Sequence, residues 1–271
     1  DDEERIKDIL VKKFDMHELH SYVWAYHDEY KALGIEVEKN IELVNAANPN
    51  IRTIRNSIIP TQLCQVKYNT GYSADFGVFE IGRVVKGLKA DGTANERRSL
   101  GVVLFDKKGS EKDLYFKALN MVNTLVLSIK HKAPEFNKVS PTHAYEHPKN
   151  TAEILVSGKN VGTVHTLHPS VLSKLDKTGK AVCFEIDIDD LIEVSNDNIA
   201  FVEPSTQQST YYDLSLDISN GAKFSELKKC WDSLNLEELT SVKVIDNSTV
   251  EIDPKGISSS VLPASMSTKM R

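Results

Sequence analysis

The stretch NPNIRTIRNSIIPTQLCQVKYN, residues 48–69, decides how the rest of the sequence is interpreted. It opens with the turn signal Asn48-Pro49, and residues 51–55 then have a composition that suits a strand. Ser57 stands where a helix N-cap is expected, and Pro60 falls in the first helical turn, where no intrahelical hydrogen bond is lost. The pattern predicts a strand that passes directly into a helix.

The predicted helix has one apolar stripe, because Ile59, Leu63 and Val66 recur at helical spacing. Arg55 precedes it, and we expect its guanidinium to bind a carboxylate or backbone carbonyls with two of its donors. Two interpretations stay open for the segment. It packs only within this chain, or it builds an interface with another subunit.

The composition predicts a soluble, globular chain of one large domain and one smaller domain. The chain has 271 residues, of which 40% are hydrophobic and 27% are charged. No apolar run approaches the roughly 20 residues needed to cross a bilayer, and the opening DDEERIKDIL is too charged for a secretion signal. We therefore expect a cytoplasmic location and no membrane partner. Because the sequence begins without methionine, we also expect it to be a piece of a longer protein.

The charge balance limits any role with nucleic acid. The formal net charge is -6 and the pI is near 5.8, so the chain lacks the global basic character of proteins that wrap nucleic acid alone. Any such role must be local, or must depend on another chain.

Hydrophobic periodicity predicts an α+β chain in which strands dominate and helices pack outside them. We expect helices over residues 2–14, 29–33, 111–130 and 169–175, and strands over 19–25, 40–44, 75–85, 98–105, 152–156, 160–166 and 181–187. A polar stretch near residue 196 indicates a domain boundary. The second domain, 196–249, has a strand over 211–218, a helix over 224–234 and a strand over 241–245. We expect residues 250–271 to be a poorly structured tail.

Residues that could carry chemistry have unfavourable spacing. Cys64, Cys183 and Cys230 are odd in number and far apart, which favours reduced, packed thiols. The histidines of His17-Glu18-Leu19-His20 are too close for a HExxH zinc site, and the remaining histidines lack a ligand set. Asp187, Asp189 and Asp190 could bind Mg²⁺, but acidic residues at the start of a short helix are more simply explained by capping. Physical reasoning alone predicts a scaffold without a visible active site.

A series of short motifs resembles the β subunit of the phenylalanyl-tRNA synthetase family. The motifs occur in the family's order over residues 1–195, and they are Asn48-Pro49 with RNSIIP (55–60), FEIG (79–82), ERRSLG (96–101), TAEI (151–154), the run from Gly162 to HPSVL (168–172), and FEIDI (184–188). The shared order makes the resemblance specific, because each motif alone would be weak. The resemblance implies a class II aminoacyl-tRNA synthetase-like module, with an antiparallel sheet flanked by helices.

The resemblance also implies that this copy of the module is inactive. The family's active copies, in the catalytic α subunit, place an arginine between an aromatic residue and a glutamate on a strand. Here Phe79 is followed directly by Glu80, and CFEIDIDDLIEV (183–194) has no second arginine. Arg83 is no replacement, because strand alternation puts it on the side of Phe79, opposite Glu80. We expect no catalytic, cofactor or metal residue in this chain, with ATP and Mg²⁺ used through the α subunit.

The retained motif residues are then expected to be structural or to form a subunit interface. They are Asn48, Pro49, Arg55, Ile59, Pro60, Leu63, Phe79, Glu80 and Gly82. The expected partners are the catalytic α subunit, in an (αβ)₂ heterotetramer, and tRNA in the complete enzyme. The alternative is a stand-alone module that keeps a degenerate synthetase fold for binding protein or RNA. A small hydrolase using the histidines or Asp187 and Asp189 is the least favoured interpretation.

The second domain resembles the start of the ferredoxin-fold anticodon-binding domain of the same family. Tyr211 and Tyr212 stand where the family has an arginine pair, so they are the candidate tRNA contacts, by stacking on a base. The sequence ends near the point where the second half of that fold would begin. We therefore expect a partial βαβ unit.

Overall fold

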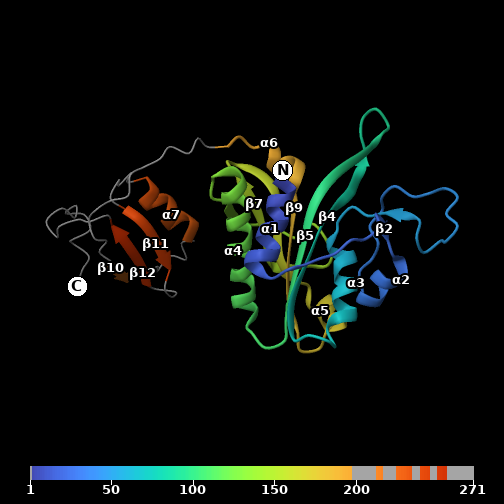
Figure 1. Cartoon of the computed structure of the whole chain (residues 1–271), viewed down its shortest axis with the longest axis horizontal. Coiled ribbons are helices and arrows are strands. Elements are labelled where there is room, and N and C mark those ends of the chain that lie inside the picture. Colours follow the sequence, from blue (N-terminus) through green and yellow to red (C-terminus); the bar gives the residue numbers. More distant parts are fainter. Residues whose placement is uncertain (1, 197–211, 216–223, 234–238, 245–248, 255–271) are drawn as a thin grey trace. The chain divides into compact units, whose positions relative to one another are not determined.

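The computed structural model describes residues 2–196, 212–215, 224–233, 239–244 and 249–254. The chain divides into two compact units, residues 1–199 and 200–271. Figure 1 shows the helices and strands of each unit. None of the described helices is both long enough and apolar enough to cross a membrane.

A seven-stranded sheet forms the centre of the first unit. Its strand order is β1-β4-β5-β9-β8-β7-β6. The strands are β1 (His17–Glu18), β4 (Asp75–Leu88), β5 (Ala94–Asp106), β6 (Glu135–Lys138), β7 (Glu146–Val156), β8 (Lys159–Leu167) and β9 (Lys180–Asp187). Neighbours are antiparallel except β1 and β4, which are parallel. The predicted α+β architecture, with an antiparallel sheet, is confirmed at this level.

Helices cover both faces of the sheet because the central strands are apolar on both sides. Phe79, Val102 and Phe184 pack toward α1 (Asp2–Phe14) and α4 (Glu111–Lys130). The alternate residues Val103 and Cys183 pack toward the other face. That face carries α2 (His27–Leu33), α3 (Ile59–Asn69) and α5 (Pro169–Leu175), as Figure 1 shows.

The long helix α4 has the predicted bounds, which are fixed by the capping residues at its two ends. Ser110 is the N-cap, and its hydroxyl accepts the Asp113 N–H at 3.0 Å. His131 ends the helix in the left-handed conformation, with φ 58°. The short helix α5 also has its predicted bounds, with Pro169 in its first turn. The short helix α6 (Ile188–Glu193) is capped by Asp187, whose side chain accepts the Asp190 N–H.

The predicted strands over residues 19–25, 40–44 and 51–55 are mostly wrong. The structure has only β2 (Trp24–Ala25) paired with β3 (Thr53–Ile54), and a single bridge between Glu42 and Thr53. Side chains satisfy part of the backbone here in place of a strand neighbour. The Asn40 amide donates to the carbonyl oxygens of Ile54 and Val85, both at 2.8 Å.

The second unit contains a small antiparallel sheet with the order β10-β12-β11. Its described elements are β10 (Tyr212–Ser215), α7 (Phe224–Asp232), β11 (Leu239–Val244) and β12 (Thr249–Pro254). The predicted β-α-β succession is present. The prediction that the tail starts at residue 250 is wrong, because β12 is the central strand of this sheet. Residues 255–271 lie outside the described residues.

The close approach of β8 to β9 generates a stability prediction at Gly162. A Cβ atom there would lie 2.1 Å from the Glu185 carbonyl oxygen, which is backbone and cannot move aside. Gly162→Ala should therefore lower the free energy of unfolding by about 1–3 kcal/mol or more. Urea unfolding checks this through the fluorescence of Trp24, with Trp231 replaced by phenylalanine. The control is Gly71→Ala, where no atom lies within 4 Å of the added Cβ; equal losses would contradict the prediction.

Candidate functional site

The segment 48–69 begins at an exposed turn, passes through the core of the first unit and returns to the surface at Tyr68. The Asn48 side-chain oxygen accepts the Asn50 N–H at 2.9 Å, which fixes the turn around Pro49. The chain then passes through β3 and Arg55 into α3. The predicted order of turn, strand and helix is present, although the strand is only two residues long.

Arg55 is buried and makes three hydrogen bonds through its guanidinium. Nη2 donates to Glu80 Oε1 at 2.8 Å, Nε donates to the Arg83 carbonyl at 3.1 Å, and Nη1 donates to Ser21 Oγ at 2.6 Å. Ser21 Oγ in turn donates to the second Glu80 oxygen at 2.7 Å. The Arg55 and Glu80 side chains are only 1% and 3% exposed. The guanidinium thus binds one carboxylate and one backbone carbonyl with one donor each, and its remaining bond reaches Glu80 through Ser21, so the bidentate contact expected from the sequence is not formed.

Gly82 belongs to the same cluster. A Cβ atom on Gly82 would lie 2.5 Å from Arg55 Nη2 and 2.8 Å from Glu80 Oε1. Only glycine therefore leaves room for the ion pair against β4. Arg83, one residue further on, forms a separate and exposed pair with Glu96 at 2.6 Å.

A second carboxylate, the partly buried Glu185 on β9, holds the start of α3. It accepts from Ser57 Oγ at 2.6 Å, from the Ile58 N–H at 3.1 Å, and from Ser99 Oγ at 2.7 Å. The Ser57 hydroxyl also lies 2.9 Å from the Tyr145 hydroxyl, and it is 3.2 Å from the Ile59 N–H that it accepts. Ser57 thus lies one position before the observed N-cap, Ile58, which has no side-chain cap.

Helix α3 lies directly on the sheet. Ile59, Leu63 and Val66 are fully buried, and Pro60 is buried in the first turn. Gln62 Nε2 donates to the Gly101 carbonyl at 2.9 Å, and a Cβ atom on Gly101 would lie 2.9 Å from Ile58 and Gln62 atoms. The apolar stripe predicted from the sequence is therefore filled by this chain's own core.

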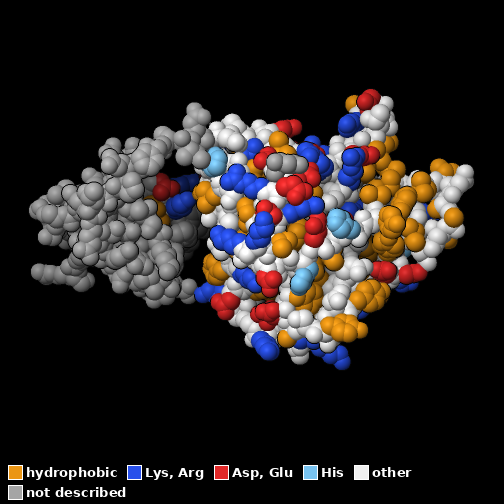
Figure 2. All heavy atoms as spheres, in the orientation of Figure 1, with side chains coloured by type: hydrophobic (Ala, Val, Ile, Leu, Met, Phe, Trp, Pro, Cys, Tyr) orange, Lys and Arg blue, Asp and Glu red, His pale blue; other side chains and the backbone are white. Residues whose placement is uncertain are grey.

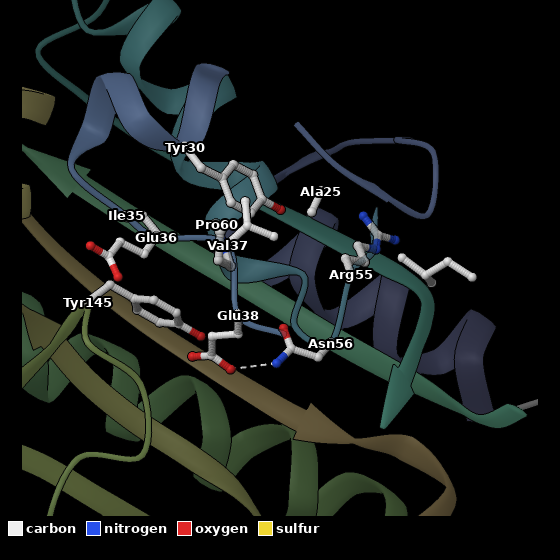
Figure 3. A pocket seen from close by; sticks show the side chains of 11 residues that line it. Ala25, Tyr30, Ile35, Glu36, Val37, Glu38, Arg55, Asn56, Pro60 and Tyr145 are labelled. Carbon is white, nitrogen blue, oxygen red and sulfur yellow. Dashed lines mark hydrogen bonds between the residues drawn. The ribbon is translucent and has the colours of Figure 1, made fainter. Parts of the chain in front are cut away.

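The hollow beside Arg55 and Tyr145 is nearly closed. Its volume is only ≈ 10 Å³, about the space for one water. Figure 3 shows Glu38 and Asn56 joined across it, by a bond of 2.6 Å. Glu38 also binds His143 Nδ1 at 2.6 Å, and the His143 ring stacks on Tyr145 with centroids 5.0 Å apart. This hollow cannot hold a nucleotide.

The hydrogen bond between Glu38 and His143 shifts the pKa of both side chains. It is the main cause of a lowered pKa for Glu38. Burial alone would lower the pKa of His143, but Glu38 outweighs it and the pKa of His143 is raised. The neighbouring His165 has no carboxylate partner, and burial lowers its pKa to about 4.

The acidic residues of the DIDD stretch are bound to arginines of β5. Asp187 accepts from Arg97 at 2.8 Å and 3.0 Å, and Asp189 accepts from Arg98 at 2.6 Å. Arg97 also pairs with Asp190 at 2.7 Å. The described residues contain no group of three or more candidate ligands that could hold a metal ion. The cluster caps α6 and neutralises β5.

The two candidate tRNA contacts are only partly placed. Tyr211 lies outside the described residues, and Tyr212 begins β10. Both therefore stay predictions, as does the role of the segment 48–69 at a subunit interface.

Comparison with known proteins gives the family. Residues 1–188 match the model of the phenylalanyl-tRNA synthetase β-chain CLM domain, which covers more than half of the chain. This chain belongs to the phenylalanyl-tRNA synthetase β-chain family. The motif series along residues 1–195 indicates the same family, so that expectation from the sequence is confirmed.

Similar curated proteins are also β subunits of phenylalanine–tRNA ligase. The chain is 25% identical over 252 residues to the phenylalanine–tRNA ligase β subunit of Leptospira biflexa, covering 89% of this chain and 31% of that protein. It is 28% identical over 235 residues to the chloroplastic β subunit of Phaeodactylum tricornutum, covering 81% and 33%. The chain thus spans about a third of the length of these curated relatives.

The buried Arg55–Glu80 pair generates a stability prediction. Arg55→Met keeps the packing volume but leaves a buried carboxylate unpaired, so the free energy of unfolding should fall by about 3–5 kcal/mol. The matched control is Arg83→Met, which breaks an exposed pair and should cost about 1 kcal/mol or less. Urea unfolding measures both; similar losses would mean that the buried pair has no special role.

The buried His165 ring generates a pH prediction. Its folded-state pKa of about 4 lies below the ordinary 6.5, so the unfolded chain binds a proton first as the pH falls. Stability should therefore be lost between pH 6.5 and pH 4, by about 3 kcal/mol in total. His165→Leu should remove that part of the slope in unfolding curves measured across this range.

The control for this slope is Cys183→Ala, which opens a cavity in the same core opposite His165. Burial raises the pKa of the Cys183 thiol, so it stays uncharged throughout. This variant should lose a constant amount at every pH. A His165→Leu curve parallel to that of the unsubstituted protein would refute the assignment.

Proposed function

We propose that this chain is a non-catalytic scaffold portion of the β subunit of phenylalanine–tRNA ligase, which attaches phenylalanine to its tRNA using ATP. The observation that carries the proposal concerns β4, which resembles the strand that bears the nucleotide-binding arginine in the family's active copies. Phe79 is followed directly by Glu80, and Glu80 is bound inside the chain by Arg55. A buried, paired carboxylate at this point offers no positive charge to a triphosphate.

The arginines of β4 and β5 support the same conclusion. Arg83 binds Glu96, Arg97 binds Asp187, and Arg98 binds Asp189. Transfer of an adenylyl group needs free guanidinium groups or metal ions to stabilise charge on phosphorus. ATP and Mg²⁺ are therefore assigned to the catalytic α subunit, and this chain alone is expected to be inactive.

The architecture favours a class II synthetase-like module. The support comes from the largely antiparallel sheet with helices on both faces. In the second unit, β12 lies between β10 and β11 and is antiparallel to both. A β-α-β unit followed by a third strand inserted between the first two suits the first part of a ferredoxin-like domain. That domain would contact tRNA in the complete (αβ)₂ enzyme.

The exposed start of the segment 48–69 is the part that is free to touch the α subunit. Arg55, Ile59 and Leu63 are buried in this chain and can only position it. Leu43 and Val44, in the loop before Asn48, are 46% and 97% exposed. Figure 2 shows hydrophobic side chains gathered over the part of the unit that carries β2 and its neighbouring loops. An exposed apolar surface of this kind is typical of an interface.

The second candidate is a stand-alone module that uses a degenerate synthetase fold to bind protein or RNA. The same exposed loop suits any protein partner, so the loop alone does not decide. The family match over residues 1–188, with relatives aligned over as much as 89% of the chain, favours the first candidate. Co-purification separates the two, because only the first requires binding to a catalytic α chain.

The decisive experiment is a pull-down of the α subunit from the same organism by this chain. We expect α to be retained, and we expect the chain alone to show neither ATP–pyrophosphate exchange nor aminoacylation. Retention of another protein with no binding to α would favour the stand-alone module. Pyrophosphate exchange by the purified chain would refute the non-catalytic assignment.

The exposed loop gives a sharper prediction. Replacing both Leu43 and Val44 by aspartate should weaken binding to α about tenfold, because it puts charges into a desolvated contact. Unfolding stability should change by about 0.5 kcal/mol or less, since both side chains are exposed. The control is Leu127→Asp on α4, which is 39% exposed on the opposite face of the sheet. Equal weakening by both variants would place the interface elsewhere.

A further inference from the structure

A hollow of ≈ 440 Å³ lies between the first half of α4 and the strands β6 and β7. This volume is in the range of binding pockets in proteins. Its apolar lining comes from Tyr115, Phe116, Leu119 and Phe136. Phe116 is 56% exposed, so its ring forms an accessible part of the lining. The hollow is large enough for one or two bulky side chains.

The strand beside the hollow, β6, is the last strand of the sheet. The Val139 N–H donates to the Thr151 carbonyl of β7 at 3.1 Å. In an antiparallel pair, residues alternate between groups that face the neighbour and groups that face away. Phe136 and Lys138 therefore direct their backbone N–H and C=O groups outward, where the described residues provide no strand.

The rim of the hollow is positively charged although the chain as a whole is acidic. Lys112, Lys138 and Lys149 line it, and none of them has an ion-pair partner among the described residues. Lys112 lies 6.0 Å from the centroid of the Phe116 ring. The acidic group of the lining, Glu111, accepts a bond from Asn150 at 3.4 Å. The rim therefore complements carboxylates on an incoming group.

One buried polar group of the lining is also unsatisfied. Thr166 on β8 lines the hollow and is only 1% exposed. Its hydroxyl has no hydrogen-bond partner within the described part of the chain. Buried hydroxyls nearly always have a partner, so an unsatisfied one beside a hollow indicates a missing polar contact.

We propose that β6 and this hollow bind an extended segment of a partner protein, in which apolar side chains alternate with acidic ones. The segment adds a strand to the outward edge of β6, and its apolar side chains fill the hollow over Phe116 and Phe136. Its carboxylates lie near Lys138 and Lys149. Main-chain hydrogen bonds give affinity in this mode, and alternate side chains give specificity.

A strand-forming peptide fits these observations better than RNA does. RNA would use the aromatic rings and the lysines, but it would gain nothing from a free strand edge. A short edge strand that carries a lysine also serves to prevent aggregation. That role alone, however, leaves the aromatic hollow and the Thr166 hydroxyl unexplained. The surface lies at the opposite end of the sheet from β1 and β4, so it is independent of the proposed contact with α.

The test uses the full chain and a capped ten-residue peptide that alternates glutamate with valine and phenylalanine. The comparison probes are the same peptide with lysine for glutamate, and a ten-nucleotide oligouridylate. Fluorescence anisotropy measures binding, and amide hydrogen exchange reports on residues 135–139. We expect the acidic peptide to bind, the lysine peptide to bind more weakly, and exchange at Phe136 and Lys138 to slow in the complex.

Two variants at one position separate the charge from the strand edge. Lys138→Gln removes only the charge and should weaken binding about two- to fivefold. Lys138→Pro also removes the outward N–H, while the bonds from β6 to β7 stay intact, so it should weaken binding further than Lys138→Gln does. The control pair, Lys12→Glu and Lys89→Glu, lies outside the lining of the hollow and should change nothing.

Three results would overturn the proposal. The first is no binding of the acidic peptide to the unsubstituted chain. The second is equal binding by Lys138→Gln and Lys138→Pro with no protection at residues 136 and 138, because the strand edge would then not take part. The third is tighter binding of the oligouridylate than of the acidic peptide, which would assign the surface to nucleic acid.

Discussion

The structure of the first unit depends on the buried ion pair between Arg55 and Glu80. Two charges removed from water are costly unless every donor and acceptor is satisfied. Here the guanidinium also binds Ser21 and the Arg83 carbonyl, and Ser21 binds the second carboxylate oxygen. The pair therefore joins two separate stretches of chain, those of Ser21 and Arg55, to the strand β4. It fixes where the segment 48–69 crosses the sheet and hence where α3 begins.

Glu185 completes the attachment from the neighbouring part of the sheet. Its carboxylate accepts bonds from Ser57, the Ile58 N–H and Ser99, so it satisfies a backbone donor at the start of α3 that would otherwise be buried without a partner. The helix is then fixed in position and in rotation by polar groups at its start and by the Ile59, Leu63 and Val66 stripe along its length. This leaves the preceding loop exposed.

Much of this architecture could be predicted because its causes are local. The bounds of α4 and α5 follow from apolar period, an N-cap serine and a first-turn proline, all of which lie within a few residues. The irregular structure of residues 19–55 could not be predicted. There the Asn40 side chain, in place of a neighbouring strand, satisfies the carbonyls of Ile54 and Val85. Such contacts join residues far apart in the sequence. The start of β12 could not be predicted either, because its sheet partners stabilise a strand that its own sequence hardly indicates.

The candidate site, too, has some features that the sequence predicts and others that it does not. A carboxylate partner for Arg55 is predictable because an isolated arginine before a buried helix needs one, yet the sequence cannot identify Glu80 as that partner. The role of Glu185 cannot be read from the sequence alone, although a signal exists: in AVCFEI (181–186) it is the one charged residue of an apolar strand, and a charge placed there needs hydrogen-bond donors. Its donor Ser57 lies 128 positions away. Pairing at that distance follows from the fold alone.

The positions of Glu80 and Glu185 also support the proposal that this chain is not catalytic. Glu80 and Glu185 lie on the face of the sheet that carries α3, and their donors come from the segment 55–58, from Ser21 and from Ser99. A phosphate group brought to this face would meet the partly buried Glu185 carboxylate, and charges of like sign repel each other strongly at low dielectric. Adding one arginine to β4 would not suffice, because Arg55 already neutralises Glu80 and its removal would leave that carboxylate buried and unpaired. The contacts that attach α3 to the sheet therefore support the proposal that this face does not bind a nucleotide.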